Sequence, residues 1–298
     1  MDLLPVNETV TLKGHEGPIN CAIFNQDGNY CLTGSADRSI KLWNPHTGMM
    51  IKTYKGHGKE ISAIQLPKTD NSRFVSGSGD RNVYIWDVQT GKTVQRFQDH
   101  TQRVNSVDFN KDGTIVVSGS YDSTVRLWDC RSLSKKPLQI LSDSKDSIES
   151  VCIVDFQIVT GSVDGSVRVY DIRNRTMVED KVGFPVTSVQ LSNDRNCILV
   201  ATLDNTIRLF DKETGELLCD YQGHVNSQYR LSPCFTSTDS HVISGSEDGK
   251  IHFWDLVEGQ IVKTLDAHSR VVTSVKYHPN LHTMISCSFD GTAKLWTS

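Results

Sequence analysis

Short runs of alternating hydrophobic and polar residues occur along most of the chain, separated by turns rich in Gly, Asp and Ser. In residues 123–128, for example, Val125 and Leu127 fall on one face of an extended segment. An alternation with a period of two indicates half-buried β-strands, because successive side chains of a strand point to opposite faces of its sheet. Gly, Asp and Ser favour the tight turns between strands. The pattern therefore predicts an all-β protein built from many short strands.

A longer repeat groups these strands. A turn of the Gly-Ser-x-Asp type is followed, six residues after its Asp, by an aromatic residue, and the arrangement occurs seven times with 40 to 44 residues between successive aromatics. The aromatics are Trp43, Trp86, Trp128, Tyr170, Phe210, Trp254 and Trp296. Four strands per period with these turns are typical of WD repeats. We therefore expect residues 1–298 to form a single seven-bladed WD-repeat β-propeller.

The two ends of this series are expected to meet in one blade. The last repeat ends near Trp296 and supplies three strands, whereas residues 9–12 precede the first Gly14-His15 pair, at the place of an outer fourth strand. A sheet edge with unpaired backbone groups is unfavourable, and pairing the two ends removes it. The N-terminal strand is thus predicted to complete the last blade and close the ring.

Five repeats carry a His ahead of their first strand, and an Asp follows each His after 22 to 24 residues. These are His15, His57, His100, His224 and His268. A single copy of His, Ser and Asp would suggest a nucleophilic triad, but an enzyme needs one such site and not five. We interpret the set as structural: the Trp N–H donates to the Ser of the Ser-x-Asp turn, that Ser to the His, and the His to the Asp.

Repeats four and five depart from this pattern. Ser144 and Val182 fall at the His position, and Tyr170 and Phe210 replace the Trp. Because half of a buried hydrogen-bond network is worse than none, the joint loss of both ends fits a shared network. We expect these two blades to be locally less stable than the other five.

Little in the sequence favours catalysis, a metal or a nucleic acid. The 31 basic and 35 acidic side chains give a net charge of −4, without the basic excess that meets phosphate backbones. No phosphate-binding Gly loop, metal-ligand spacing or cofactor motif occurs. Four further histidines are expected on the surface or at edges: His241, His252, His278 and His282.

The cellular compartment is predicted from the N-terminal residues and from the length of the apolar runs. The first five residues do not have the pattern of a signal peptide, and no apolar run is long enough to span a membrane. We expect a protein of the cytoplasm and nucleus that is not an enzyme, needs no cofactor or metal, and binds neither nucleic acid nor membrane directly.

A binding surface is predicted where the rim loops of a propeller surround its central channel. The residue inside each Ser-x-Asp turn and the residues that begin each inner strand should lie there. Several are aromatic or Arg, the types that dominate interface energy; the alternative is that each aromatic packs on its neighbouring loop. The predicted partner-binding residues are Glu60, Arg103, Tyr121, Val163, Leu203, Tyr229, Arg230 and Phe289.

A second interaction motif occurs in repeats three and four. Trp128-Asp129-Cys130-Arg131 and Tyr170-Asp171-Ile172-Arg173 look like the W-D-x-R boxes of substrate receptors for cullin-RING ubiquitin ligases, although Tyr170 departs from the Trp of that motif. In this interpretation Arg131 and Arg173 contact the ligase adaptor. In the alternative they are ordinary exposed turn residues after a strand.

Longer phrases carry a more specific resemblance. Residues 24–33, 41–45, 203–218, 223–231 and 246–259 resemble the mitogen-activated protein kinase organizer family of WD-repeat proteins, and the similarity extends over nearly the whole chain. The resemblance implies a small scaffold with two associations: the spliceosome in its catalytic stages, and a mitogen-activated protein kinase cascade. We expect a monomeric subunit of larger assemblies that acts in pre-mRNA splicing, with spliceosome components and kinases as partners.

Overall fold

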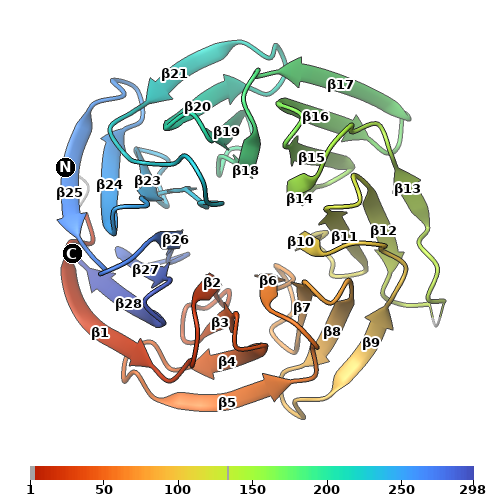
Figure 1. Ribbon diagram of the computed structural model, residues 1–298, viewed down its shortest axis with the longest axis horizontal. Helices are drawn as coiled ribbons and strands as arrows, with labels where there is room; N and C mark the ends of the chain where they lie inside the picture. The colour runs from red at the N-terminus through yellow and green to blue at the C-terminus, as the bar shows by residue number, and fades with distance from the viewer. Residues whose placement is uncertain (1–3, 133) are drawn as a thin grey trace.

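Seven four-stranded antiparallel sheets surround a central channel in the computed structural model of this chain (Figure 1). The structure describes residues 4–132 and 134–298; residues 1–3, which belong to the segment that lacks a signal-peptide pattern, lie outside this range. In each blade the first strand lines the channel and the last lies at the outer edge. The prediction of an all-β, seven-bladed propeller is confirmed.

The blades are numbered along the chain, and the seventh includes the N-terminal strand. Their strands are β2 (Ile19–Phe24), β3 (Cys31–Ser35), β4 (Ser39–Trp43) and β5 (Met50–Lys55) in blade 1; β6 (Ile61–Gln65), β7 (Arg73–Ser78), β8 (Val83–Asp87) and β9 (Thr93–Phe97) in blade 2; β10 (Val104–Phe109), β11 (Ile115–Ser120), β12 (Val125–Asp129) and β13 (Gln139–Leu141) in blade 3; β14 (Ile148–Val154), β15 (Gln157–Ser162), β16 (Ser166–Asp171) and β17 (Thr176–Lys181) in blade 4; β18 (Val186–Leu191), β19 (Cys197–Thr202), β20 (Thr206–Asp211) and β21 (Leu217–Tyr221) in blade 5; β22 (Cys234–Phe235), β23 (His241–Gly245), β24 (Lys250–Asp255) and β25 (Ile261–Asp266) in blade 6; and β26 (Val272–Tyr277), β27 (Thr283–Ser288), β28 (Thr292–Thr297) and β1 (Asn7–Lys13) in blade 7.

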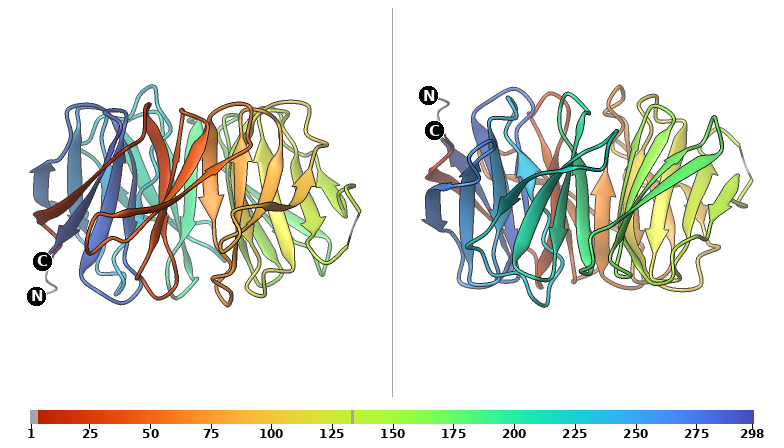
Figure 2. Two further views of the ribbon diagram at one scale, coloured as in Figure 1. Left: turned by 90° about the horizontal axis from the view of Figure 1, so that it is seen from below. Right: turned by 90° about the horizontal axis from the view of Figure 1, so that it is seen from above.

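Seen from the side, the strands run between two layers of loops (Figure 2). One layer contains the Ser-x-Asp turns between the second and third strands, together with the loops that enter each first strand; we call it the upper face. The other contains the turns between the third and fourth strands and is called the lower face.

The ring closes through the two ends of the chain. β1 pairs antiparallel with β28, from Asn7 opposite Thr297 to Lys13 opposite Thr292. The Lys294 ammonium also donates to the Glu8 carboxylate at 2.7 Å. The predicted closure by the N-terminal strand is confirmed, and the pairing leaves no free edge on β28.

The hydrophobic core lies between neighbouring blades, and the Gly of the repeat allows them to approach. A Cβ atom on Gly77 would lie 2.8 Å from Val104 Cγ1 of the next blade, and one on Gly119 would lie 2.5 Å from Ile148 Cγ2. These glycines are the penultimate residues of the second strands, β7 and β11. The repeated Gly is therefore needed for close packing of one blade on the next more than for a turn.

A buried chain of hydrogen bonds links loop, turn and strand in four blades, and one member of the predicted chain was wrong. In blade 2 the Trp86 indole N–H donates to Ser76 Oγ at 2.8 Å, Ser76 Oγ lies 2.8 Å from His57 Nε2, and His57 Nδ1 lies 2.9 Å from Asp80. Nδ1–H donating to the carboxylate leaves Nε2 to accept from Ser76. The same chain uses Thr33, Ser118 and Ser286 in blades 1, 3 and 7.

The hydroxyl of the Ser-x-Asp turn does not belong to this chain. Ser78 Oγ instead donates to the Lys59 carbonyl at 3.2 Å and accepts the Asp80 N–H at 3.1 Å. Register explains the difference: Ser76 pairs with Tyr84, so it is the diagonal neighbour of Trp86, whereas Ser78 lies two residues further from the indole.

Blade 6 lacks the predicted chain altogether. Neither ring nitrogen of the buried His224 has a hydrogen-bond partner among the described residues, and Trp254 N–H donates to the Gln222 carbonyl. Its repeat is the longest, with 44 residues between Phe210 and Trp254, and only two residues form its inner strand. The extra length moves the entering loop away from the register that the other blades share.

The positions of two further histidines also correct the sequence interpretation. His252 and His278 are 5% and 3% exposed, respectively, and are not surface residues. His252 Nδ1 lies 3.1 Å from Thr264 Oγ1. His278 packs on the Phe24 ring, with 5.0 Å between centroids, and its Nδ1 accepts the Asn280 and Leu281 N–H groups.

Arg replaces His as the partner of the turn Asp in blades 4 and 5. Arg168 donates to Asp164 at 2.8 Å, and Arg208 donates to Asp204 at 2.5 Å. Each Arg stands four residues after its Asp in the third strand, so the pair is local and does not reach the closing aromatic residue. In blade 4, Ser144 at the His position also donates to Asp164 at 3.0 Å, so this carboxylate is satisfied without the closing aromatic residue.

Replacing Ser118 by Ala should destabilise the protein by about 2–3 kcal/mol, because it leaves Trp128 Nε1 and His100 Nε2 buried without their shared partner. Urea unfolding followed by tryptophan fluorescence measures this change in the free energy of unfolding. Thr101→Ala, on the exposed loop of the same blade, serves as the control. Equal stability of the two variants would contradict the structural role of the chain.

Hydrogen exchange tests the relative stability of the blades. Amides of β15 and β19, in blades 4 and 5, should exchange faster than those of β7 and β11, because an Arg–Asp pair has replaced the four-member chain. Exchange followed by mass spectrometry of peptic fragments reports this difference. Equal protection in all four strands would show that the Arg pair substitutes fully.

Acid should destabilise the fold through blade 6. Burial, reinforced by His252, lowers the pKa of His224 to about 4, although Asp204, Asp248 and Glu247 partly oppose the shift. The unfolded chain therefore binds more protons than the folded one between pH 6.5 and 4, and stability falls as pH falls through this range. We expect a loss of about 2 kcal/mol between pH 7 and 5 from this residue.

His224→Leu should remove that part of the pH dependence, and His46→Leu, at an exposed position, should leave it unchanged. Urea unfolding at pH 7 and 5 gives the comparison. A pH dependence that His224→Leu does not alter would show that another group is responsible.

Candidate protein-interaction face

The eight predicted partner-binding residues all line the central channel, a cavity of about 1060 Å³. They come from six blades and lie where the loops of the upper face meet the channel. Tyr121 and Tyr229 are 51% and 39% exposed, and the Arg103 side chain is 51% exposed. Glu60, Val163, Leu203 and Phe289 are half-buried. The structure thus brings these residues together, and their binding of a partner stays a prediction.

The aromatic residues form two contacts on this face. The Arg103 guanidinium lies over the Tyr121 ring at 4.9 Å within blade 3. Tyr229 of blade 6 meets Phe289 of blade 7 edge to face, with 5.1 Å between ring centroids. Both pairs lie between or beside loops, as the packing alternative expected, yet both tyrosines keep a large exposed surface. Such partly exposed aromatics offer apolar area and a hydroxyl to a partner.

Glu247 holds the loop that presents Tyr229. Its Oε1 accepts the backbone N–H groups of Gln228 and Tyr229 at 2.7 and 2.9 Å, and that of Ser227 at 2.8 Å. Burial alone would raise the pKa of Glu247, but these N–H donors outweigh it and lower the pKa. The carboxylate therefore stays charged and fixes the loop that carries Tyr229 and Arg230.

Arg230 crosses the channel from blade 6 to blade 3. Its Nη1 donates to the backbone carbonyl of Asn105 on β10. The Asn105 amide donates to Glu149 Oε1 at 3.0 Å, and the Arg103 guanidinium lies 3.9 Å from the same carboxylate oxygen. Burial lowers the pKa of Arg230, and the charge of Glu149 partly offsets this. A polar cluster from three blades thus lies at the upper end of the channel.

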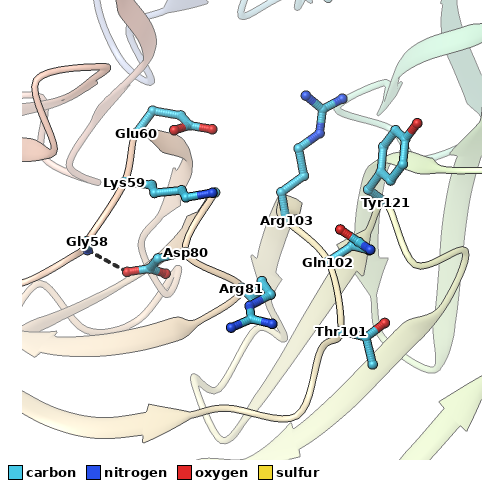
Figure 3. A pocket seen from close by; sticks show the side chains of 10 residues that line it. Gly58, Lys59, Glu60, Asp80, Arg81, Thr101, Gln102, Arg103 and Tyr121 are labelled. Atoms are coloured by element: carbon cyan, nitrogen blue, oxygen red, sulfur yellow. Dashed lines mark hydrogen bonds between the residues drawn. The ribbon is translucent and has the colours of Figure 1, made fainter.

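A second pocket opens on the upper face between blades 2 and 3, with a volume of about 810 Å³ (Figure 3). Lys59 and Glu60 project from the loop before β6, Arg81 from the turn after β7, and Arg103 and Tyr121 from blade 3. Sequence reasoning singled out Glu60, Arg103 and Tyr121 but missed Lys59 and Arg81. The available signal was Arg81 itself, directly after a turn Asp, where three other repeats have Gly.

Arg131 and Arg173 lie on the lower face, away from the residues discussed so far. The Arg131 side chain is 72% exposed and its Nε lies 3.3 Å from Asp129 Oδ1. Arg173 lies over the Phe156 ring at 5.1 Å. Both residues follow the third strand of their blade, in blades 3 and 4, and both are exposed. An adaptor contact and an ordinary turn residue would both be exposed, so the two interpretations stay open.

The described residues contain no cluster of three or more His, Cys, Asp or Glu side chains that could hold a metal ion. In the same part of the chain, no helix is long and apolar enough to cross a membrane. The four His–Asp pairs are buried parts of the blades, and their hydroxyl partners are 0% exposed. A substrate cannot reach such hydroxyls, which supports the structural interpretation of the repeated His, Ser and Asp.

Comparison with known proteins places the chain among WD-repeat proteins. Residues 58–240 match the family described as nucleolar protein 10-like, N-terminal domain, and residues 7–44 and 259–297 match the WD domain, G-beta repeat. WD-repeat propellers act as interaction scaffolds, and neither of the two family models is that of a catalytic family.

Full-length relatives give a narrower assignment. The chain is 49% identical to the WD repeat domain-containing protein 83 of Rattus norvegicus, over 93% of this chain and 87% of the relative. It is 45% identical to the protein of the same name in Homo sapiens, over 98% and 92%, and 34% identical to the Dictyostelium discoideum homolog, over 96% of both. At this identity over almost the whole length, the chain belongs to the WD repeat domain-containing protein 83 family of β-propellers.

Proposed function

We propose that this protein is a non-catalytic scaffold that binds other proteins through its upper face, within the spliceosome and thus in pre-mRNA splicing. A second role as a scaffold for mitogen-activated protein kinase signalling is part of the proposal. The observation that carries it is the gathering of Tyr121, Arg103, Tyr229 and Phe289 around one channel mouth, on loops fixed by buried hydrogen bonds.

Rigid loops favour this use of the face. A side chain that is already ordered loses little conformational entropy when a partner binds, so its contacts count almost fully towards affinity. Aromatic and Arg residues at the centre of a face are the types on which binding energy concentrates. The splicing assignment rests on the family resemblance, and a location in nucleus and cytoplasm is proposed with it.

A different function is a substrate receptor of a cullin-RING ubiquitin ligase. Arg131 and Arg173 favour it, because both are exposed on one face at the same position of adjacent blades. An adaptor would then bind the lower face and leave the upper face for substrate.

Affinity purification from nuclear and cytoplasmic extracts, followed by mass spectrometry, separates the two functions. The natural chain should recover splicing factors, and a variant with Arg103, Tyr121, Tyr229 and Phe289 all changed to Ala should lose about tenfold or more of them. Arg131→Ala with Arg173→Ala is the matched lower-face variant and should keep them. Loss of a ligase adaptor in this second variant, with splicing factors absent throughout, would favour the receptor function instead.

A further inference from the structure

Two arginines on the upper face occupy a backbone conformation that favours Gly. In the turn between the second and third strands, the residue after the Asp has a positive φ in all seven blades. Blades 4, 6 and 7 have glycines there, Gly165, Gly249 and Gly291, whereas blades 1 and 2 have Arg38 and Arg81, with φ of 68° and 73°. An L-residue is disfavoured in this region, and such positions cluster where function requires the side chain.

Arg81 places its charge in the pocket between blades 2 and 3, together with Lys59 and Arg103 (Figure 3). All three side chains are exposed, and neither Lys59 nor Arg81 has an ion-pair partner among the described residues. Like charges that line one pocket repel one another, and an anion that binds there relieves the repulsion.

The two carboxylates that line the pocket do not cancel these cations. Asp80 faces its own donors: His57 Nδ1 at 2.9 Å, the Gly58 N–H at 2.7 Å and the Asn82 N–H at 3.0 Å. Glu60 alone remains without a counter-charge, and it lies over Gly79, where a Cβ atom would approach its Oε1 to 2.1 Å. Among the described residues, two unpaired cations, Lys59 and Arg81, thus lie near one unpaired carboxylate, and Arg103 adds a charge that only the long 3.9 Å contact with Glu149 offsets.

We propose that this pocket binds an Asp- and Glu-rich segment of a partner protein. The inference rests on the proposed function, because it names the chemistry of a partner for the same face. Carboxylates of the segment would pair with Lys59, Arg81 and Arg103, its backbone N–H groups would donate to Glu60, and its apolar atoms would cover Tyr121. A volume of about 810 Å³ accommodates several residues of an extended peptide.

Arg81→Gly tests the proposal without endangering the fold, because Gly adopts the φ of 73° at least as readily as Arg. Fluorescence anisotropy of a labelled peptide of alternating Glu, Asp and Gly, titrated with the purified full chain, should show binding that weakens as NaCl rises. Arg81→Gly should weaken it by about two- to fivefold, and a triple variant with Lys59→Gln and Arg103→Gln by at least about tenfold.

Arg175→Gly is the matched control. Arg175 is exposed, has a φ of 56° and belongs to the lower-face turn between β16 and β17, so its replacement removes the same charge from the same conformation elsewhere. Unchanged binding in this variant, with loss in Arg81→Gly, supports the pocket. Equal loss in both would overturn it, since attraction would then come from overall charge.

Further arms identify the source of the negative charge. A peptide with Gln and Asn in place of Glu and Asp should not bind. Binding of a phosphorylated Ser-Gly peptide or of single-stranded RNA at least tenfold tighter than that of the carboxylate peptide would overturn the proposal in favour of a phosphate ligand. Because these titrations use only the purified chain, they fail or succeed independently of which proteins the purification experiment recovers.

Discussion

The buried chain of hydrogen bonds from Trp through Ser or Thr and His to Asp fixes the loops of the upper face to the strands beneath them. In blade 2 the Asp80 carboxylate accepts from both His57 and the Gly58 N–H, so one carboxylate joins the entering loop to the turn. Lys59 and Glu60 follow directly in that loop. Because each buried polar group has its partner, the chain specifies one geometry, and a single deletion leaves two groups unsatisfied. The loops of the candidate interaction face are held rigid by this arrangement.

Blade 6 shows what happens where the chain is missing. With His224 unpaired, the entering loop is held instead by Glu247 at Tyr229 and by Arg230, which reaches Asn105 on the far side of the channel. Tyr229 and Arg230, which line the channel, thus belong to the blade that lacks the hydrogen-bond chain. Buried polar groups without partners are unfavourable, and their concentration in this blade indicates that its loop is shaped for the channel mouth more than for stability.

The fold could be predicted from the sequence because the repeat depends on residue types with strict local requirements. The period, the Gly that admits the neighbouring blade and the closing aromatic all predict the same seven sheets. The errors arose where a choice depended on register. Ser76 and Ser78 stand two residues apart in β7, so their side chains point to the same face of the sheet. Only the diagonal position of Ser76 relative to Trp86 decides which hydroxyl joins the chain. The irregular loop of blade 6 could not be foreseen, because its His and Trp are both present.

The net charge of the chain likewise does not predict the local charge of the upper face. The net charge of −4 counts the turn aspartates in full, yet in the blades with a His–Asp pair those carboxylates turn inward. Asp37 accepts from His15, Ser39 and the Glu16 N–H, and although burial alone would raise its pKa, these bonds hold the pKa at about 2. The neighbouring Arg38 and Arg81 point to solvent instead. A chain that is acidic overall therefore presents Arg38 and Arg81 as exposed cations on its upper face, because the turn carboxylates beside them are used within the blades.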